Sequence, residues 1–93
     1  MSITFEWSLE KSAGNARKHG VSFTEAATCF GDPFARVVHD PDHSKDEDRY
    51  IMVGMSTGSR ILVVAHTERG DNIRIISARP AERRETASYW QSH

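Results

Sequence analysis

Residues 49–66 read "RYIMVGMSTGSRILVVAH", two apolar runs separated by the polar stretch "STGS". Runs of this length that are rich in Ile, Val, Met and Tyr are typical of β-strands, and so short a connection joins antiparallel neighbours. The near-continuous apolar character of 50–55 and 61–65 predicts central strands with at least one face covered by helices. This hairpin therefore predicts an antiparallel sheet at the centre of the fold.

Further strands are predicted on both sides of the hairpin, at 3–6, 35–39 and 73–79. The connections between the last four strands are too short for parallel crossovers, so we expect an antiparallel meander of about four to five strands. The turn "TERGDN" leaves two registers open. One places Arg79 opposite Arg60; the other, centred on Gly70-Asp71, places Arg79 opposite Leu62.

Three helices are predicted around this sheet. Ser8 is a good N-cap for a helix through about His19, and "SFTE" at 22–25 is a capping box for a second helix that "GDP" at 31–33 ends. Pro80 suits the first position of a last helix, about 81–91. The expected fold is α+β, with two N-terminal helices and one C-terminal helix in the order β-α-α-β-β-β-β-α.

The 93 residues predict a single domain, 1–93, that buries roughly 60% of its unfolded surface. The single cysteine, Cys29, excludes an intrachain disulfide and a cysteine-based metal site. The first residues lack the apolar core of a signal peptide, and the longest aliphatic run, Ile61 to Ala65, is too short to cross a bilayer. We therefore expect a soluble, cytoplasmic protein without membrane contact.

The formal net charge of −1 conceals an asymmetry along the chain. Residues 1–59 carry a net charge of −3, whereas 60–93 carry +2 with arginine as their only cationic residue besides histidine. A guanidinium binds phosphate or carboxylate through two parallel hydrogen bonds. A mixed-charge, solvated surface is the simpler interpretation, and an anion-binding surface is the alternative.

The first of the two registers separates the polar side chains into two groups, roughly 15 to 20 Å apart. Groups so far apart cannot contact one phosphate. The histidines are candidates for an acid or base near neutral pH, and the acidic loop lacks the spacing of an EF-hand, so we expect no metal and no cofactor. One group contains Arg49, His66, Arg69, His43 and Glu47; the other contains Arg60 and Arg79.

Six short motifs together resemble the BrnT family of toxins, and they follow one another over almost the whole chain. Ser8 stands where the family commonly has Asp, and both residues cap a helix. The motifs are "FEW" at 5–7, "K…N..KHGVSF" at 11–23, "DP" at 32–33, "DHS..E.R" at 42–49, "TERG" at 67–70 and "RIISARPA…E" at 74–85.

The resemblance implies a RelE-like fold and a type II toxin that cleaves RNA and arrests growth. Its partner would be a BrnA-like antitoxin that carries a DNA-binding domain, so that operator DNA is contacted only through the antitoxin. The competing interpretations are a non-enzymatic module that binds nucleic acid or an acidic protein through its arginine-rich C-terminal part, and a metal-dependent hydrolase that uses the acidic loop.

Metal-independent RNA cleavage uses the substrate 2′-OH as nucleophile, together with a base, an acid and donors that stabilise the phosphorane oxygens. The family-like motifs make Arg79 and Arg69 the first candidates for stabilising charge. The candidates for acid and base are His43, His66 and Glu47. The candidates for binding RNA phosphates are Lys11, Lys18, Arg49, Arg74 and Arg60.

Overall fold

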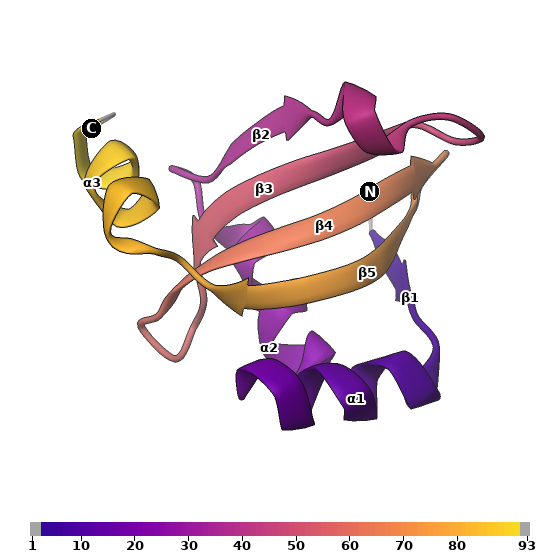
Figure 1. Ribbon diagram of the computed structural model, residues 1–93, viewed down its shortest axis with the longest axis horizontal. Coiled ribbons are helices and arrows are strands. Elements are labelled where there is room, and N and C mark those ends of the chain that lie inside the picture. The colour runs from indigo at the N-terminus through magenta and orange to yellow at the C-terminus, as the bar shows by residue number, and fades with distance from the viewer. Residues whose placement is uncertain (1–2, 92–93) are drawn as a thin grey trace.

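A computed structural model describes residues 3–91 of the chain, which form one five-stranded sheet with three α-helices. Figure 1 shows the sheet face-on, with α2 behind it, α1 along one edge and α3 beyond one end. The elements are β1 (Thr4–Glu6), α1 (Leu9–His19), α2 (Phe23–Thr28), the short 3-10 helix η1 (Cys29–Gly31), β2 (Arg36–His39), the 3-10 helix η2 (Pro41–His43), β3 (Arg49–Met55), β4 (Ile61–Arg69), β5 (Asn72–Pro80) and α3 (Arg83–Gln91).

The strand order is β1-β5-β4-β3-β2, and the expected α+β fold with its element order is confirmed. The last four strands form the antiparallel meander, but β1 pairs with β5 in parallel, Thr4 opposite Asn72 and Glu6 opposite Arg74. The sheet is therefore mixed, and the prediction of a wholly antiparallel sheet is wrong. Loop length limits only strands that follow each other directly, whereas β1 and β5 are separated by most of the chain.

The register of β4 and β5 follows the turn at Gly70, which has a left-handed φ of 60°. This is the second of the two expected alignments, with one change. Ala65 faces Ser77 while His66 faces Ile75, so Ile76 is an extra residue in β5. Such a β-bulge shifts all later pairs by one position, and Arg79 faces Val63 rather than Leu62.

The hairpin of β3 and β4 is also displaced by one residue. A connecting loop at 56–59 would place Met55 opposite Arg60 and Arg49 opposite His66, whereas in the structure Met55 faces Ile61 and His66 faces Tyr50. Because side chains alternate between the two faces of a strand, this displacement changes which polar groups share a face.

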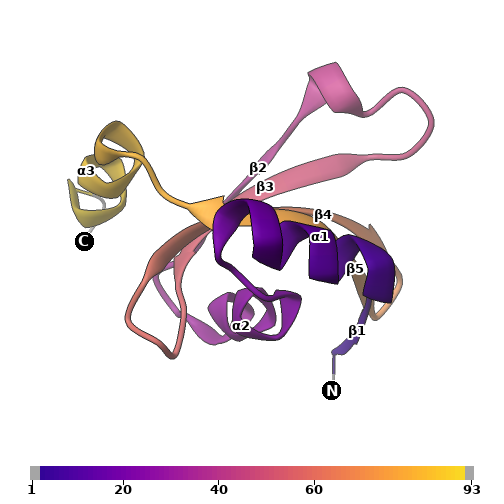
Figure 2. The same ribbon diagram turned by 60° about the horizontal axis from the view of Figure 1, so that its bottom comes forward.

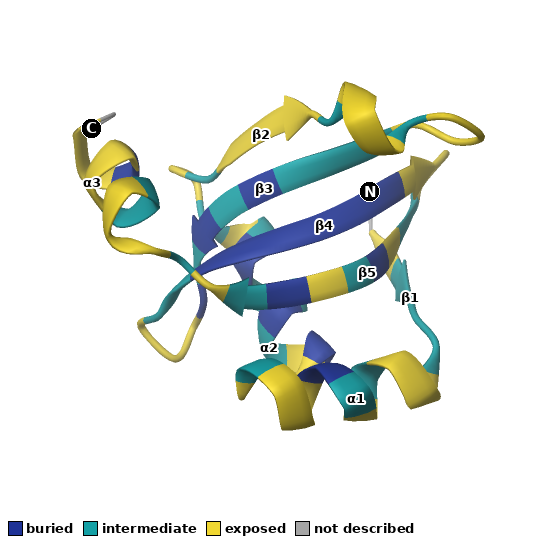
Figure 3. Cartoon of the chain, in the orientation of Figure 1, coloured by how far each residue is buried: buried dark blue, intermediate teal, exposed yellow. Residues whose placement is uncertain are grey.

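The core lies between the sheet and the segment that contains α2 and η1. Figure 3 shows β4 buried over most of its length, whereas β2, the edge strand, is exposed. Figure 2 shows α1 and α2 on the same side of the sheet. The core residues are Val21, Phe23, Ala26, Cys29, Met52, Leu62, Val64, Ile75 and Ala78.

Asn15 joins α1 to the edge of β5 that β1 leaves unpaired. Its amide Nδ2 donates to the carbonyl oxygens of Val21 (2.9 Å) and Ala78 (2.7 Å), and its Oδ1 accepts from the Ala78 N–H (3.1 Å). β1 pairs only with 72–74, so the side chain of Asn15 satisfies strand groups that no neighbouring strand reaches. The contact fixes where the C-terminal end of α1 lies.

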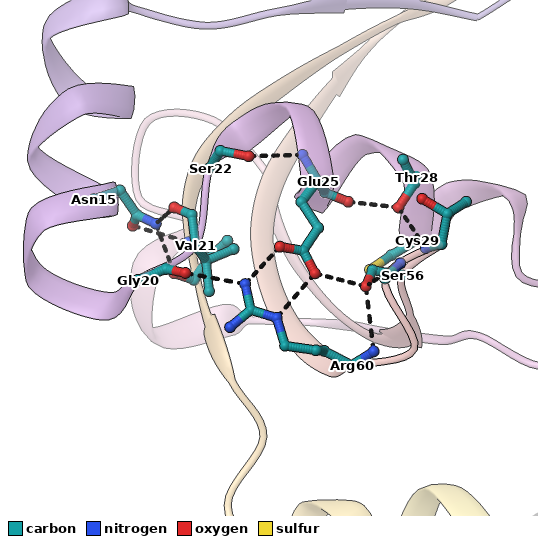
Figure 4. Close-up of polar contacts among 12 residues, drawn as sticks. Asn15, Gly20, Val21, Ser22, Glu25, Thr28, Cys29, Ser56 and Arg60 are labelled. Carbon is teal, nitrogen blue, oxygen red and sulfur yellow. Dashed lines mark hydrogen bonds and ion pairs between the residues drawn. The ribbon is translucent and has the colours of Figure 1, made fainter.

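A polar network anchored on Glu25 joins α2 to the turn between β3 and β4 (Figure 4). Arg60 donates to both carboxylate oxygens of Glu25 and to the carbonyl oxygen of Gly20, and Ser56 donates to Glu25 at 2.7 Å. Hydrogen bonds from Arg60 hold the pKa of Glu25 below its usual range. The arginine side chain is thereby fixed on the framework.

The last helix begins later than expected. Pro80 is the final residue of β5 rather than the first of a helix, and α3 starts at Arg83. Pro80 lies where β1 no longer pairs with β5, so that part of β5 is an edge of the sheet and the N–H that proline lacks is not needed there. The Tyr89 hydroxyl donates to Asp32 Oδ2 at 2.6 Å, and the same oxygen accepts the Met55 N–H at 2.8 Å. Asp32 thus fixes the position of α3.

We predict that Asn15→Ala lowers the free energy of unfolding by about 2 to 4 kcal/mol, because backbone groups of Ala78 and Val21 lose their partners inside the protein. Asn15→Asp should be at least as damaging at neutral pH, since a carboxylate cannot donate to two carbonyl oxygens. Urea unfolding measures both changes.

The matched control is Arg17→Ala on the same helix, where the side chain is exposed. It should change the free energy of unfolding by less than about 0.5 kcal/mol. If Asn15→Ala has an equally small effect, Asn15 does not anchor the β5 edge.

Candidate active site on the open face of the sheet

The face of the sheet opposite α2 contains a cavity of about 450 Å³. It lies where β5 approaches α3 on one side and the end of α1 on the other. Its apolar lining residues are Ile51, Val63, Ala65 and Ala78, and its polar ones are Lys18, His19, Ser77, Arg79 and Glu85. Arg79, the first sequence-based candidate, therefore lies in a hollow together with another cation, a histidine and a carboxylate.

Arg79 and Glu85 form a two-pronged ion pair, with both guanidinium–carboxylate hydrogen bonds at 2.8 Å. Glu85 Oε1 also accepts the Glu82 N–H at 2.8 Å, which closes the first turn of α3. These hydrogen bonds hold the pKa of Glu85 below its usual range, and the bonds from Arg79 have the largest effect. The guanidinium of Arg79 is consequently oriented by α3 while about a third of its side chain stays exposed.

Lys18 and His19 enter the cavity from the last turn of α1. Gly20 ends that helix with a left-handed φ of 69°, as the sequence predicts. Asn15 fixes the same helix against Ala78, which is next to Arg79 in the chain. The position of α1 therefore places Lys18 and His19 at the cavity.

Four of the other sequence-predicted residues lie around the far end of the open face: Glu47, Arg49, Arg69 and Arg74. Arg69 donates to Glu47 from Nε (2.6 Å) and Nη2 (3.2 Å), and these bonds keep the pKa of Glu47 below its usual range. Arg69 lies six residues along β4 from Val63, the partner of Arg79, so the two arginines are about 20 Å apart. Arg69 and Arg79 are thus at opposite ends of the sheet as expected, but the two expected groups do not stay together, because His66 is buried and Arg60 lies outside the Arg79 cavity.

His66 does not lie at an accessible end of the sheet. β4 continues to Arg69, and the imidazole is fully buried on the helix-covered face, 4.9 Å from the Phe30 ring and 5.9 Å from the Tyr50 ring. Burial lowers the pKa of His66. The expectation that this histidine is placed for chemistry at the sheet end is wrong, because the strand is longer than its apolar run.

The remaining candidates are distributed over the surface. His43, in η2, contacts Asp40 at 2.8 Å, and Lys11 is exposed near the start of α1. Arg60 belongs to the Glu25 network and lies outside the cavity. Their proposed roles in catalysis or RNA binding stay predictions, and their positions favour Lys18 as the cation of α1 that meets Arg79.

Two cavity residues, His19 and Glu85, were not among the sequence-based site candidates. Both lie inside the motifs that carry the family resemblance, "KHGVSF" and "RIISARPA…E". The family motifs therefore pointed to both residues. The contact between Glu85 and Arg79, which is six residues earlier in the chain, depends on the β-bulge and on where α3 begins.

The thiol of Cys29 is buried, and burial raises its pKa to about 12. It is therefore protonated at neutral pH and makes a poor nucleophile. Across residues 3–91, no cluster of three or more His, Cys, Asp or Glu side chains has the arrangement of a metal site, and no described helix is long and apolar enough to span a membrane.

A family model described as "Ribonuclease toxin, BrnT, of type II toxin-antitoxin system" matches residues 7–85. The chain belongs to the BrnT family. It is thus a toxin of a type II toxin-antitoxin system with ribonuclease character, which implies an RNA substrate and an antitoxin protein as partner. The expected family membership is confirmed.

The solved structure of the Brucella abortus ribonuclease toxin BrnT, determined at 1.1 Å, is similar to this BrnT-family chain with a TM-score of 0.67 and 24% sequence identity. The alignment covers 88% of this chain and 100% of that one, and it shows a shared fold. No curated protein sequence matches the chain.

The Arg79–Glu85 pair predicts a pH-dependent contribution to stability. The pKa of Glu85 is lower in the folded chain than its ordinary value of 4.5, so the pair stabilises the fold above that pH and loses its effect as the pH falls below it. Glu85→Gln should therefore lower the melting temperature most near pH 7, and the difference from wild type should shrink between pH 4.5 and 2.

Thermal unfolding followed by circular dichroism measures this difference, with Glu82→Gln as the matched control in the same turn. A constant difference between wild type and Glu85→Gln over the whole pH range would contradict an ionic origin.

Proposed function

We propose that this BrnT-family chain is a metal-independent endoribonuclease that cleaves RNA in the cavity at Arg79. The observation that carries the proposal is the convergence of Lys18, His19, Arg79 and Glu85 on one cavity of about 450 Å³. These side chains offer cationic donors and proton-transfer groups within a single hollow, which is the set that such a reaction needs.

In the proposed reaction the 2′-oxygen of RNA forms a bond to the neighbouring phosphorus while the bond from phosphorus to the 5′-oxygen breaks. Negative charge gathers on the non-bridging oxygens during this step. Arg79, oriented by its two hydrogen bonds to Glu85, donates to those oxygens, and Lys18, which lines the same cavity, adds positive charge.

Two groups in the cavity are suited to moving protons. His19 is a histidine, the side chain whose ordinary pKa lies closest to neutral pH. Glu85 is a carboxylate at neutral pH, with its pKa held below the usual range by Arg79, and it can accept a proton. We assign the 2′-OH proton to the Glu85 carboxylate and the protonation of the departing 5′-oxygen to the His19 imidazole.

We further propose that a BrnA-like antitoxin neutralises the toxin by covering this face, that free toxin arrests growth in the cytoplasm, and that the fold is RelE-like. The proposed antitoxin contact is supported by a second cavity of about 320 Å³ that shares Ile51 and Glu85 with the first. It is partly apolar and carries Arg36 and Arg84, which suits a partner segment with acidic and apolar side chains. A segment bound there would close the RNA site.

The test is to incubate the purified chain, free of antitoxin, with RNA in excess EDTA. Wild type should cleave the RNA, and Arg79→Gln should cleave it at least about 100-fold more slowly, as expected when a charge-stabilising donor is removed. Gel analysis with mapping of the cut ends measures the rate and shows whether the products carry a 2′,3′-cyclic phosphate.

Arg17→Gln is the matched control, because it removes the same charge from an exposed position outside the cavity lining. It should cleave as wild type does. Equal rates for Arg79→Gln and wild type would remove Arg79 from the site. Intact RNA in every reaction, with salt-sensitive binding retained, would support the non-enzymatic binding module instead.

A further inference from the structure

Three polar side chains form a row across β3, β4 and β5 at the far end of the open face. Thr67 on β4 is directly opposite Arg49 on β3 and Arg74 on β5. Thr67 lies two and four residues from Ala65 and Val63, which line the Arg79 cavity, so the row shares the face of that cavity. One threonine is thus flanked by two arginines.

The row contains buried donors that the described part of the chain leaves unsatisfied. Thr67 is 3% exposed, and its Oγ1 has no hydrogen-bond partner; Arg49 Nε is also buried without one. Buried polar atoms in native proteins are nearly always paired, and leaving one unpaired is unfavourable. Two such donors on adjacent strands, on the same face as the Arg79 cavity, are suited to a ligand that brings acceptor oxygens.

We propose that Arg49, Thr67 and Arg74 form a second phosphate-binding subsite, which holds the backbone of the RNA away from the position of cleavage. Adjacent strands are about 4.8 Å apart, so the two guanidinium groups start from either side of the threonine and can converge above it. An RNA phosphate offers several acceptor oxygens, which match the donors of two guanidiniums and one hydroxyl.

The neighbouring carboxylates are compatible with this subsite. Glu47 accepts hydrogen bonds from Nε and Nη2 of Arg69, and these bonds hold Arg69 beside the row of three side chains. Glu6 lies 3.7 Å from Arg74 Nη1, beyond hydrogen-bond length, so Arg74 keeps donors for a phosphate. Arg49 supplies the buried unpaired donor itself.

The subsite rests on the proposed function, because it needs an RNA that crosses the open face. Thr67 is four residues along β4 from Val63, the partner of Arg79, so the two sites are about 13 Å apart. That distance is too long for one phosphate to contact both. The subsite therefore binds a different nucleotide from the one that is cleaved, and it fixes the direction of the strand.

The experiment measures binding of a 2′-O-methyl RNA oligonucleotide, which lacks the attacking hydroxyl, at several salt concentrations. Arg49→Gln should reduce the slope of log affinity against log salt by about 1, as expected when one phosphate contact is lost. Arg17→Gln, which removes an exposed arginine elsewhere, should keep the wild-type slope. Cleavage of RNA by Arg17→Gln should also equal that of the wild type.

Thr67→Val gives an independent test that distinguishes a role in binding from a purely structural role. The substitution keeps the volume and removes an unsatisfied buried hydroxyl, so the melting temperature of the free protein should rise or stay constant. Affinity for the oligonucleotide should nevertheless fall by about tenfold, the loss of a hydrogen bond to a charged group.

The outcomes separate the two proposals. Wild-type slopes for Arg49→Gln together with wild-type affinity for Thr67→Val would overturn the subsite, and continued cleavage by the wild type would leave the proposed function intact. A reduced slope and affinity in a protein that cleaves no RNA would support the subsite and reject the proposed cleavage. A parallel loss of stability and affinity in Thr67→Val would also overturn the subsite.

Discussion

The hydrogen bonds between the Asn15 side chain and the backbone of Ala78 are the constraint on which the candidate site depends. β1 covers only the first third of β5, and the exposed strand edge beyond it needs partners. One amide side chain provides both a donor and an acceptor there, and it comes from a helix instead of another strand. The end of α1 is thereby placed beside Arg79. The same hydrogen bonds therefore satisfy the backbone groups of the strand edge and bring Lys18 and His19 to the cavity.

Carboxylates decide what each arginine of this nearly neutral chain is able to do. Glu25 holds Arg60 in the framework between α2 and the β3–β4 turn, where its donors are used internally. Glu85 orients Arg79 but leaves the guanidinium at the wall of a cavity. Arg49 has a buried nitrogen that no described residue satisfies. The count of arginines in the sequence therefore says little about function until their acidic partners and their face of the sheet are known.

Local patterns predicted the helices, the meander and the location of Arg79 at one end of the sheet, because caps, turns and apolar periods act over a few residues. The failures arose where distant parts of the chain meet. The parallel pairing of β1 depends on β5, the extra residue Ile76 displaces Arg79 by one pair, and β4 extends past its apolar run so that His66 becomes a core residue. His19 and Glu85 were missed for the same reason, since only tertiary structure brings them to Arg79.

The β-bulge at Ile76 connects these errors to the function of the open face. Without it, Arg79 would face Leu62, whose side chain is fully buried in the core, and a guanidinium on that face would meet the apolar residues beneath α2. The extra residue places Arg79 opposite Val63 on the open face and Ala78 opposite Val64 in the core, where Ala78 bonds to Asn15. The bulge thus lets two successive residues do different work: Ala78 packs in the core and anchors α1 through Asn15, while Arg79 lies at the proposed phosphate site.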